Sequence, residues 1–282
     1  MNILIFGSKG YFGSAFRQMY PDAACPETDI ADPDQIAEAL RAHRPDVVLN
    51  CAGKTGKPNV EWCEDHKEET VRSNVTGPLI LLDECRARGI YLVHLSSGCI
   101  YDGDNGGKGF AETDPPNFTG SYYSRTKPWA DTMLRDYALV LRLRLPFDGT
   151  GNPRNLIQKL IRYARVQDEP NSITCLSDFC KVAASLILRR ATGIYNVVNE
   201  GPISPYEIVC LYRDIVDPSH AFARATLAEM GGLVKVKRSN CVLSGDKLRR
   251  AGIVMRPTAE AVREALLQIK AARRGVGAVS LS

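Results

Sequence analysis

Two short segments near the middle of the chain carry residue types that can move a proton. The first is Ser96-Ser97-Gly98-Cys99-Ile100-Tyr101 after an apolar run, and the second is Tyr123-Ser124-Arg125-Thr126-Lys127. Residues four apart on a helix share one face, so the Lys127 ammonium can lower the pKa of the Tyr123 phenol toward neutrality. Tyr123 can then exchange a proton with a substrate oxygen, and Ser97, at a strand end, can hydrogen-bond that oxygen as well. These side chains predict proton transfer coupled to reduction of a carbonyl.

A glycine-rich turn at the N-terminus predicts the matching cofactor site. Residues 1–6 read as an apolar strand, and Gly7-Ser8-Lys9-Gly10-Tyr11-Phe12-Gly13 follows at once and runs into a helix. Glycines at this spacing let the backbone turn tightly and approach a pyrophosphate, which sits on the helix N-terminus. We therefore expect a dinucleotide to bind at this loop.

The segment where the second strand of the sheet is expected bears on the choice between NAD and NADP, and it has no clear strand pattern. Only residues 21–27 separate Tyr20 from Thr28, and no carboxylate stands clearly at a strand end to bind the ribose 2′-hydroxyl of NAD. Lys9 can face a 2′-phosphate instead, so we expect NADPH, with NADH as the alternative and an exposed Lys9 as the plainer interpretation. The predicted cofactor residues are Gly7, Lys9, Gly10, Tyr11, Phe12, Gly13, Asp29, Ile30, Cys51, Ala52, Gly53, Thr55, Asn74, Tyr123, Lys127 and Pro146.

Composition indicates a globular cytoplasmic protein. The 282 residues are 44% hydrophobic, and no run approaches the roughly 18 apolar residues of a membrane span. Nine cysteines without a Cys-x-x-Cys pair argue against a disulfide framework and predict no metal site. The net charge of +4 is dispersed and favours anionic small molecules over nucleic acid.

Alternating strand and helix patterns predict the fold class. Strands are expected at 2–6, 46–51, 90–95, 139–144 and 193–198, and helices at 12–20, 33–43, 60–88, 122–137, 245–250 and 258–272, with a further helix starting after Ser204. This order predicts an α/β protein with a Rossmann-type, doubly wound parallel sheet and a smaller C-terminal substrate-binding lobe. We assign residues 1–146 with 172–199 to the dinucleotide-binding domain, and 147–171 with 200–282 to the lobe.

Several blocks resemble a known family, namely residues 52–64, 116–121, 152–155, 170–174 and 238–240. With the two segments described first, they resemble extended short-chain dehydrogenase/reductases acting on nucleotide sugars. The chain is most similar to plant-type nucleotide-rhamnose synthase 3,5-epimerase/4-reductases and to dTDP-4-dehydrorhamnose reductase. The resemblance implies conversion of UDP- or dTDP-4-keto-6-deoxy-D-glucose to the L-rhamnose nucleotide with NADPH, and it implies a homodimer.

That reaction needs an acid/base on each face of the sugar as well as the reductase residues Ser97, Tyr123 and Lys127. Cys99 lies two residues after Ser97 on an extended segment, so both side chains can face the sugar. The related GDP-fucose synthases carry a similar run whose cysteine is interpreted as an acid/base. Without the resemblance, Cys99 would be interpreted as a packing residue.

A second acid/base group is needed on the face of the sugar ring opposite Cys99. The histidine that serves in GDP-fucose synthases aligns near Asn155, which cannot usefully transfer protons. Lys159 lies one helical turn later and resembles a lysine of the plant-type enzymes, so we expect it to be the second group, with an exposed surface lysine as the alternative. Arg238 is expected to bind the pyrophosphate in a bidentate manner. The predicted substrate residues are Asn59, Ser97, Cys99, Asn117, Thr119, Asn152, Arg154, Asn155 and Arg238.

Two other functions fit the same residues. One is a plain 4-keto reductase supplied by a separate epimerase, for which Cys99 and Lys159 would be irrelevant. The other is a non-catalytic regulatory subunit that binds NADP, against which the presence of Ser97, Tyr123 and Lys127 together argues. The sequence leaves the choice between UDP and dTDP open.

Overall fold

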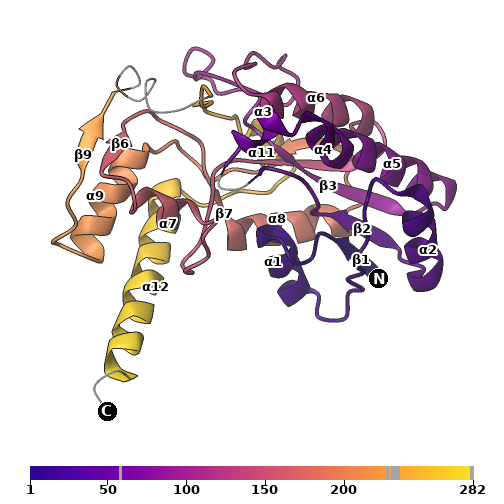
Figure 1. Cartoon of the computed structure of the whole chain (residues 1–282), viewed down its shortest axis with the longest axis horizontal. Coiled ribbons are helices and arrows are strands. Elements are labelled where there is room, and N and C mark those ends of the chain that lie inside the picture. Colours follow the sequence, from indigo (N-terminus) through magenta and orange to yellow (C-terminus); the bar gives the residue numbers. More distant parts are fainter. Residues whose placement is uncertain (57–58, 227–228, 230–235, 280–282) are drawn as a thin grey trace.

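The computed structural model describes residues 1–56, 59–226, 229 and 236–279. Five parallel strands form the central sheet, in the order β1-β2-β3-β4-β8 (Figure 1). Their bounds are β1 (Ile3–Phe6), β2 (Val47–Asn50), β3 (Tyr91–Ser97), β4 (Leu139–Leu143) and β8 (Gly193–Asn196). Since all five run the same way, their carboxyl ends meet at one edge of the sheet.

Each face of this sheet is covered by helices. Side chains alternate along a strand, so Ile3 and Ile5 join one apolar cluster while Leu4 and Phe6 join another. The first cluster includes side chains of α1 (Tyr11–Met19) and α8 (Leu176–Leu188). The second includes side chains of α2 (Pro33–His43), α5 (Gly77–Ala87) and α6 (Tyr122–Leu134). The sheet is thus doubly wound, as expected from the sequence.

The chain reverses its direction of winding at β1. After α1, a single parallel bridge joins Ala24 to Leu4, where the eroded second strand was expected. The chain then passes through α2 and returns to the other side of β1 as β2. Ligands of open α/β sheets bind at such a switch point, outside the carboxyl ends of the strands. The end of β1 is therefore the position in the fold for a dinucleotide.

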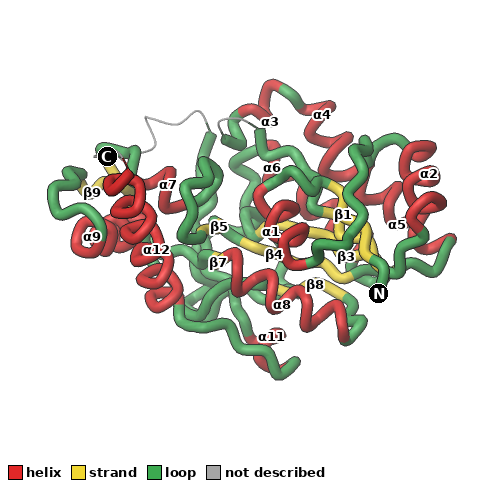
Figure 2. Tube along the Cα trace, turned by 90° about the horizontal axis from the view of Figure 1, so that it is seen from below, coloured by secondary structure: helices red, strands yellow, loops and turns green. Residues whose placement is uncertain are grey.

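A second group of elements lies beyond the sheet, with its own apolar core. Figures 1 and 2 place it at the opposite end of the molecule from α2 and α5. It contains α7 (Leu156–Leu160), α9 (Pro205–Ile215), α12 (Thr258–Val279) and the strand pairs β5 (Pro146–Phe147) with β7 (Thr174–Cys175) and β6 (Arg165–Gln167) with β9 (Ala223–Ala225). Short α11 (Asp246–Arg250) packs near β8. The exact domain boundaries given above stay a prediction.

Several elements differ from the sequence expectation, among them the short strands β5, β6, β7 and β9, which were not predicted. The helix expected over 60–88 is divided into α3 (Trp62–Asp65), α4 (Lys67–Val71), a π-helical turn η1 (Arg72–Thr76) and α5. Helix α8 was not predicted, although Ser177, Lys181 and Ser185 recur every four residues along its sequence, which is the spacing of a polar helix face. No helix in the described part of the chain is both long and apolar enough to cross a bilayer.

A buried ion pair fixes α6 against the sheet. The Asp131 carboxylate accepts from Arg142 Nε of β4 at 2.8 Å and from Ser96 Oγ of β3, and both charged side chains are almost fully buried. Replacing Asp131 by alanine would leave the Arg142 charge buried without its partner, so we expect Asp131→Ala to lower the free energy of unfolding by about 3–5 kcal/mol. Urea unfolding measures this loss.

Asp136→Ala is the matched control. Asp136 pairs with Arg135 at 3.8 Å, but both side chains are more than half exposed. Exposed pairs contribute little, so the control should change stability by no more than about 0.5 kcal/mol. Similar losses in both variants would contradict the structural role given to Asp131.

Candidate active site

The structure brings together the three residues predicted to reduce a carbonyl. Ser97 is the last residue of β3, and Tyr123 and Lys127 lie one turn apart on α6. Helix α6 starts at the Ser121 N-cap, whose side chain accepts from the backbone N–H of Ser124 at 3.1 Å. This cap and the Asp131–Arg142 pair set the position of the helix beside β3.

The Tyr123 phenol differs from the sequence expectation. Burial raises its pKa well above the usual range, Cys99 acts in the same direction, and a hydrogen bond with Ser97 only partly opposes them. The pKa thus shifts away from neutrality, opposite to the direction expected from Lys127, because burial disfavours the charged phenolate. At neutral pH Tyr123 is a phenol, which suits donation of a proton.

Lys127 is a buried lysine with a carboxylate nearby. Burial lowers its pKa, while the nearby Asp131 and Cys99 act against that shift. His94 of β3 also faces this region, and burial together with the Lys127 charge lowers the pKa of His94 well below its usual range. Asn50 Nδ2 donates to His94 Nδ1 at 3.1 Å, so the ring hydrogen lies on Nε2, which has no partner among the described residues.

The glycine loop has the shape that a pyrophosphate needs. Gly7 has φ +73°, and a Cβ atom there would lie 2.5 Å from Ala52 N. A Cβ atom on Gly13 would lie 2.1 Å from Gly7 O, so both positions require glycine. Gly10 is the N-cap of α1 and offers no side-chain cap, which leaves the helix N-terminus open to an anion. The residues present thus fit a dinucleotide.

The other predicted cofactor residues surround this loop. Cys51, Ala52 and Gly53 follow β2, and the Asn74 amide holds the next residue by pairing with both Lys54 N and Lys54 O at 2.8 Å. Asn74 thus orders this loop through hydrogen bonds to the backbone of Lys54. Exposed Asp29 binds Arg72, and buried Ile30 packs on Gly77. Tyr11 and Phe12 open α1, and Pro146 opens β5.

Lys9 has a partner that the sequence did not indicate. Its ammonium pairs with the Glu27 carboxylate, and both side chains are more than 70% exposed. Glu27 follows the Ala24 bridge, which is where a second strand would bring an acidic residue to a ribose. One exposed group of each charge therefore lies beside the glycine loop.

Cys99 has a cationic neighbour. Nη1 of Arg144, the residue after β4, donates to Cys99 Sγ at 3.3 Å. The Ser97 hydroxyl accepts from Cys99 N at 3.2 Å, which bends the chain so that residues 97–99 form a compact turn. Cys99 is half-buried, whereas Arg144 is only 1% exposed.

Three predicted cations, Arg154, Lys159 and Arg238, lie close to one another. Arg154 donates to Thr55 Oγ1 at 2.8 Å and Arg238 to Glu61 Oε1 at 2.9 Å, so segments far apart in sequence meet here. Burial lowers the pKa of Lys159, and the charges of Arg154 and Arg238 lower it further. This cluster, Arg154, Lys159 and Arg238, can attract a diphosphate, and a lysine with a lowered pKa is suited to proton transfer.

The predicted asparagines mostly shape loops. Asn155 is fully buried, caps α7 by accepting from Ile157 N at 3.0 Å, and donates to the carbonyls of Asp148 and Thr150. Side chains of three others bind backbone within their own loops: Asn59, Asn117 and Asn152. Thr119 is exposed beside Phe118. Their contacts with a substrate remain predictions.

Comparison with known protein families identifies the family of this chain. The model of the RmlD substrate binding domain matches residues 1–271. The chain belongs to this family. The family resemblance inferred from the sequence is confirmed.

Relatives in the RmlD family include plant enzymes. The bifunctional dTDP-4-dehydrorhamnose 3,5-epimerase/dTDP-4-dehydrorhamnose reductase of Arabidopsis thaliana is 40% identical and aligns with 88% of this chain and 86% of its own length. A trifunctional UDP-glucose 4,6-dehydratase/UDP-4-keto-6-deoxy-D-glucose 3,5-epimerase/UDP-4-keto-L-rhamnose-reductase of the same plant is 37% identical over 89% of this chain. The present chain spans only 39% of that relative.

Solved structures agree with the predicted Rossmann-type fold. The L780 UDP-rhamnose synthase of Acanthamoeba polyphaga mimivirus superposes with a TM-score of 0.89 at 31% identity, covering 95% of this chain and 99% of the other. The dTDP-4-dehydrorhamnose reductase of Bacillus anthracis str. Ames, solved in complex with NADP, gives a TM-score of 0.81 at 19% identity over 96% and 99% of the two chains. The second likeness concerns the fold alone.

Several polar residues that lie against the predicted site residues of this RmlD-family protein were not predicted from the sequence. Glu27, Glu61 and Arg144 lie against predicted site residues, and Asn50 with His94 lies beneath them. One signal was available for Arg144, since Arg142 and Arg144 alternate within an apolar strand and therefore enter the interior on one side. Their partners come from distant segments and carry no local signal.

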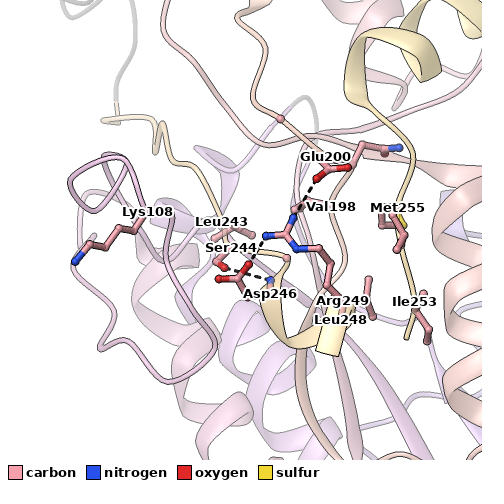
Figure 3. A pocket seen from close by; sticks show the side chains of 14 residues that line it. Lys108, Val198, Glu200, Leu243, Ser244, Asp246, Leu248, Arg249, Ile253 and Met255 are labelled. Atoms are coloured by element: carbon pink, nitrogen blue, oxygen red, sulfur yellow. Dashed lines mark hydrogen bonds and ion pairs between the residues drawn. The ribbon is translucent and has the colours of Figure 1, made fainter. Parts of the chain in front are cut away.

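The pocket drawn in Figure 3 is a different feature. It encloses about 220 Å³ beside α11, and none of the predicted site residues lines it. Arg249 lies between Glu200 and Asp246 and pairs with both, so its charge is already compensated. In the described ranges, no cluster of three metal-ligating side chains occurs.

The buried imidazole of His94 predicts a pH dependence of stability. Above about pH 6.5 both states of the protein hold a neutral ring; below it the unfolded chain binds a proton that the folded protein excludes. The free energy of unfolding should therefore fall as the pH falls from 7 to 5, with a contribution of up to about 1.4 kcal/mol per pH unit from this group. Urea unfolding at several pH values measures it.

His94→Gln separates this contribution from other titrations. Glutamine keeps an acceptor for Asn50 but does not titrate, so the variant should show a shallower loss of stability below pH 6.5. His43→Gln, at an exposed position, should retain the slope of the unmodified protein. Equal slopes in all three proteins would refute the assignment to His94.

Proposed function

We propose that the protein is an NADPH-dependent 3,5-epimerase/4-reductase that converts a UDP- or dTDP-linked 4-keto-6-deoxy-D-glucose to the L-rhamnose nucleotide. The observation that supports the proposal is that Cys99 lies among Ser97, Tyr123 and Lys127, the groups proposed to act in reduction. We assign epimerisation to Cys99 together with Lys159, which lies in the cluster with Arg154 and Arg238. The 40% identical plant relative is named for both activities. An enzyme that only reduced would have no need of the second pair.

The cofactor follows from the glycine loop and its charges. When bound, NADPH supplies the hydride for the 4-keto carbon. Gly7 and Gly13 allow the loop to fold tightly, since a Cβ atom at either position would meet backbone. The open N-terminus of α1 favours the charge of a pyrophosphate. Lys9 is the group that would meet a 2′-phosphate.

Epimerisation requires two proton-transfer groups. The protons at positions 3 and 5 of the sugar are acidic because each flanks the 4-keto group. One of Cys99 and Lys159 removes a proton from carbon, the electron pair passes into the enolate, and the other group returns a proton to the opposite face. Each position is inverted with no net change in protons.

Reduction uses the other half of the site. As the hydride reaches the carbonyl carbon, Tyr123 donates its proton to the developing alkoxide, and Ser97 hydrogen-bonds the same oxygen. Lys127 stabilises the phenolate left behind until solvent returns the proton. The raised pKa of Tyr123 keeps the phenol protonated before this step.

Further features support the predicted setting of the enzyme. The cations Arg154, Lys159 and Arg238 suit the diphosphate common to UDP and dTDP sugars.

The proposed location is the cytoplasm, whose reducing conditions keep cysteines such as the nine of this chain as free thiols. The exposed side chains of Trp129, Met133 and Tyr137 recur every four residues along α6 and beyond it, which favours a homodimer through this face.

Assays in deuterated water with UDP- and dTDP-4-keto-6-deoxyglucose test the function. NADPH oxidation should accompany formation of an L-rhamnose nucleotide with deuterium at positions 3 and 5. Tyr123→Phe should slow reduction by about 100-fold or more and still admit deuterium. Cys99→Ala and Lys159→Ala should lose incorporation to a similar extent, yet reduce pre-epimerised substrate. NMR of the products distinguishes these outcomes.

Two variants of matched type serve as controls. Cys210→Ala changes a half-buried cysteine of α9, and Lys181→Ala an exposed lysine of α8; neither should affect turnover. Product without deuterium from the unmodified enzyme would favour the plain reductase. NADPH binding without turnover of either sugar would refute both enzymatic functions in favour of a regulatory subunit or another keto sugar.

The cofactor preference can be tested at Lys9. Removing its charge should weaken the contact with a 2′-phosphate and leave the ribose hydroxyl unaffected, so Lys9→Ala should raise the KM for NADPH by about tenfold with little change for NADH. Steady-state kinetics with each cofactor at fixed ionic strength measure the ratio.

Glu27→Gln provides the opposite change. Without the carboxylate that pairs with Lys9, the preference for NADPH should increase. Lys181→Ala controls for the loss of a surface charge. A parallel rise of both KM values in Lys9→Ala would mean that Lys9 does not distinguish the cofactors.

A further inference from the structure

Arg144 is a buried cation surrounded by neutral groups. Its Nη1 donates to Ser239 Oγ at 3.1 Å as well as to Cys99, its Nη2 to Ser239 O and Asn171 Oδ1, and its Nε to Asn171 Oδ1 at 3.2 Å. No carboxylate in the described part of the chain forms a salt bridge with it. Arg142, two residues earlier, is equally buried but pairs with Asp131 at 2.8 Å.

A buried charge without a counter-charge is costly, so a neighbour that can become negative has physical significance. Two thiols lie near Arg144. Cys241 is 1% exposed and its Sγ donates to Gly98 O at 3.3 Å, which is a role for the protonated form. Cys99 accepts from Arg144 and is partly exposed, so it is the thiol that a substrate can reach.

Three titratable groups besides Arg144 lie close enough to Cys99 for it to affect their pKa values: Tyr123, Lys127 and Cys241. Burial raises the pKa of Tyr123 and of Cys241, and Cys99 acts in the same direction. Burial lowers the pKa of Lys127, and Cys99 acts against that shift. Lys127 is a second cation, but its ammonium also lies near Asp131, which offsets its charge. Arg144 forms no salt bridge with a carboxylate of the described residues, and its Nη1 directly contacts the sulfur at 3.3 Å.

We propose that Arg144 is a positioning residue that stabilises Cys99 as a thiolate and directs its sulfur toward the sugar. This proposal rests on the proposed function, in which Cys99 is one of the two epimerising groups. The thiolate takes a proton from the carbon beside the keto group and becomes a thiol, and the electrons of the broken C–H bond form the enolate. The Lys159 ammonium then gives a proton to the other face of that carbon.

Alkylation of Cys99 tests the thiolate, because only that form reacts with iodoacetamide. Rates are followed by mass spectrometry of the Cys99 peptide at pH 7 and pH 9.5. Arg144→Gln keeps donors for Asn171 and Ser239 but removes the charge, so it should slow alkylation at pH 7 by about tenfold. At pH 9.5, where ordinary thiols ionise, its rate should converge with that of the unmodified protein.

Arg144→Lys keeps the charge and should recover part of the rate at pH 7. Deuterium incorporation should fall with the alkylation rate in Arg144→Gln, while reduction of pre-epimerised substrate is retained. A merely structural role would slow alkylation equally at both pH values, and that result would overturn the proposal. An unchanged rate at pH 7 in the folded Arg144→Gln variant would overturn it as well.

A measurement on the unmodified protein keeps the test independent of variant folding. Cys99 and Cys210 are both half-buried, so alkylation at pH 7 should be about tenfold faster at Cys99. Equal rates would count against the thiolate. Deuterium incorporation that persists in Cys99→Ala would instead refute the role of the cysteine in the proposed function, whatever the alkylation rates.

Discussion

The buried pair of Asp131 with Arg142 is the interaction on which the active site depends. Asp131 lies one turn after Lys127 on α6, and its carboxylate binds both β4 and β3. Charges inside a protein are tolerated only with partners in good geometry, so this contact has little freedom to shift. Helix α6 is thereby held with Tyr123 beside Ser97 and Lys127 one turn further along the helix.

Arg142 and Arg144, two residues apart in the chain, have different partners and different roles. Arg142 is buried and pairs with the Asp131 carboxylate, and this ion pair stabilises the fold. Arg144 meets amide, hydroxyl, carbonyl and thiol groups, so its field remains available to the one neighbour that can ionise and reach solvent. The difference arises from which distant segments pack against each position.

The substrate side is assembled from segments that are far apart in sequence. Thr55 meets Arg154, Glu61 meets Arg238, and Lys159 lies within the field of both arginines. The edge of the sheet supplies the cofactor loop, while the second group of elements supplies Arg154 and Lys159. A nucleotide sugar bound between them would have its diphosphate near the cations and its keto group near Tyr123.

By itself the sequence determined the alternating elements, the glycine loop and the pairing of Tyr123 with Lys127, because these depend on short periodic spacing and local backbone geometry. It identified Cys99 and Lys159 only through resemblance. Tertiary structure alone decided the contact of Arg144 with Cys99, the pairing of Lys9 with Glu27, and the division of the helix over 60–88. It also reversed the expected pKa shift of Tyr123. Desolvation and contacts between distant segments have no local pattern, since they depend on what the completed fold places around each group.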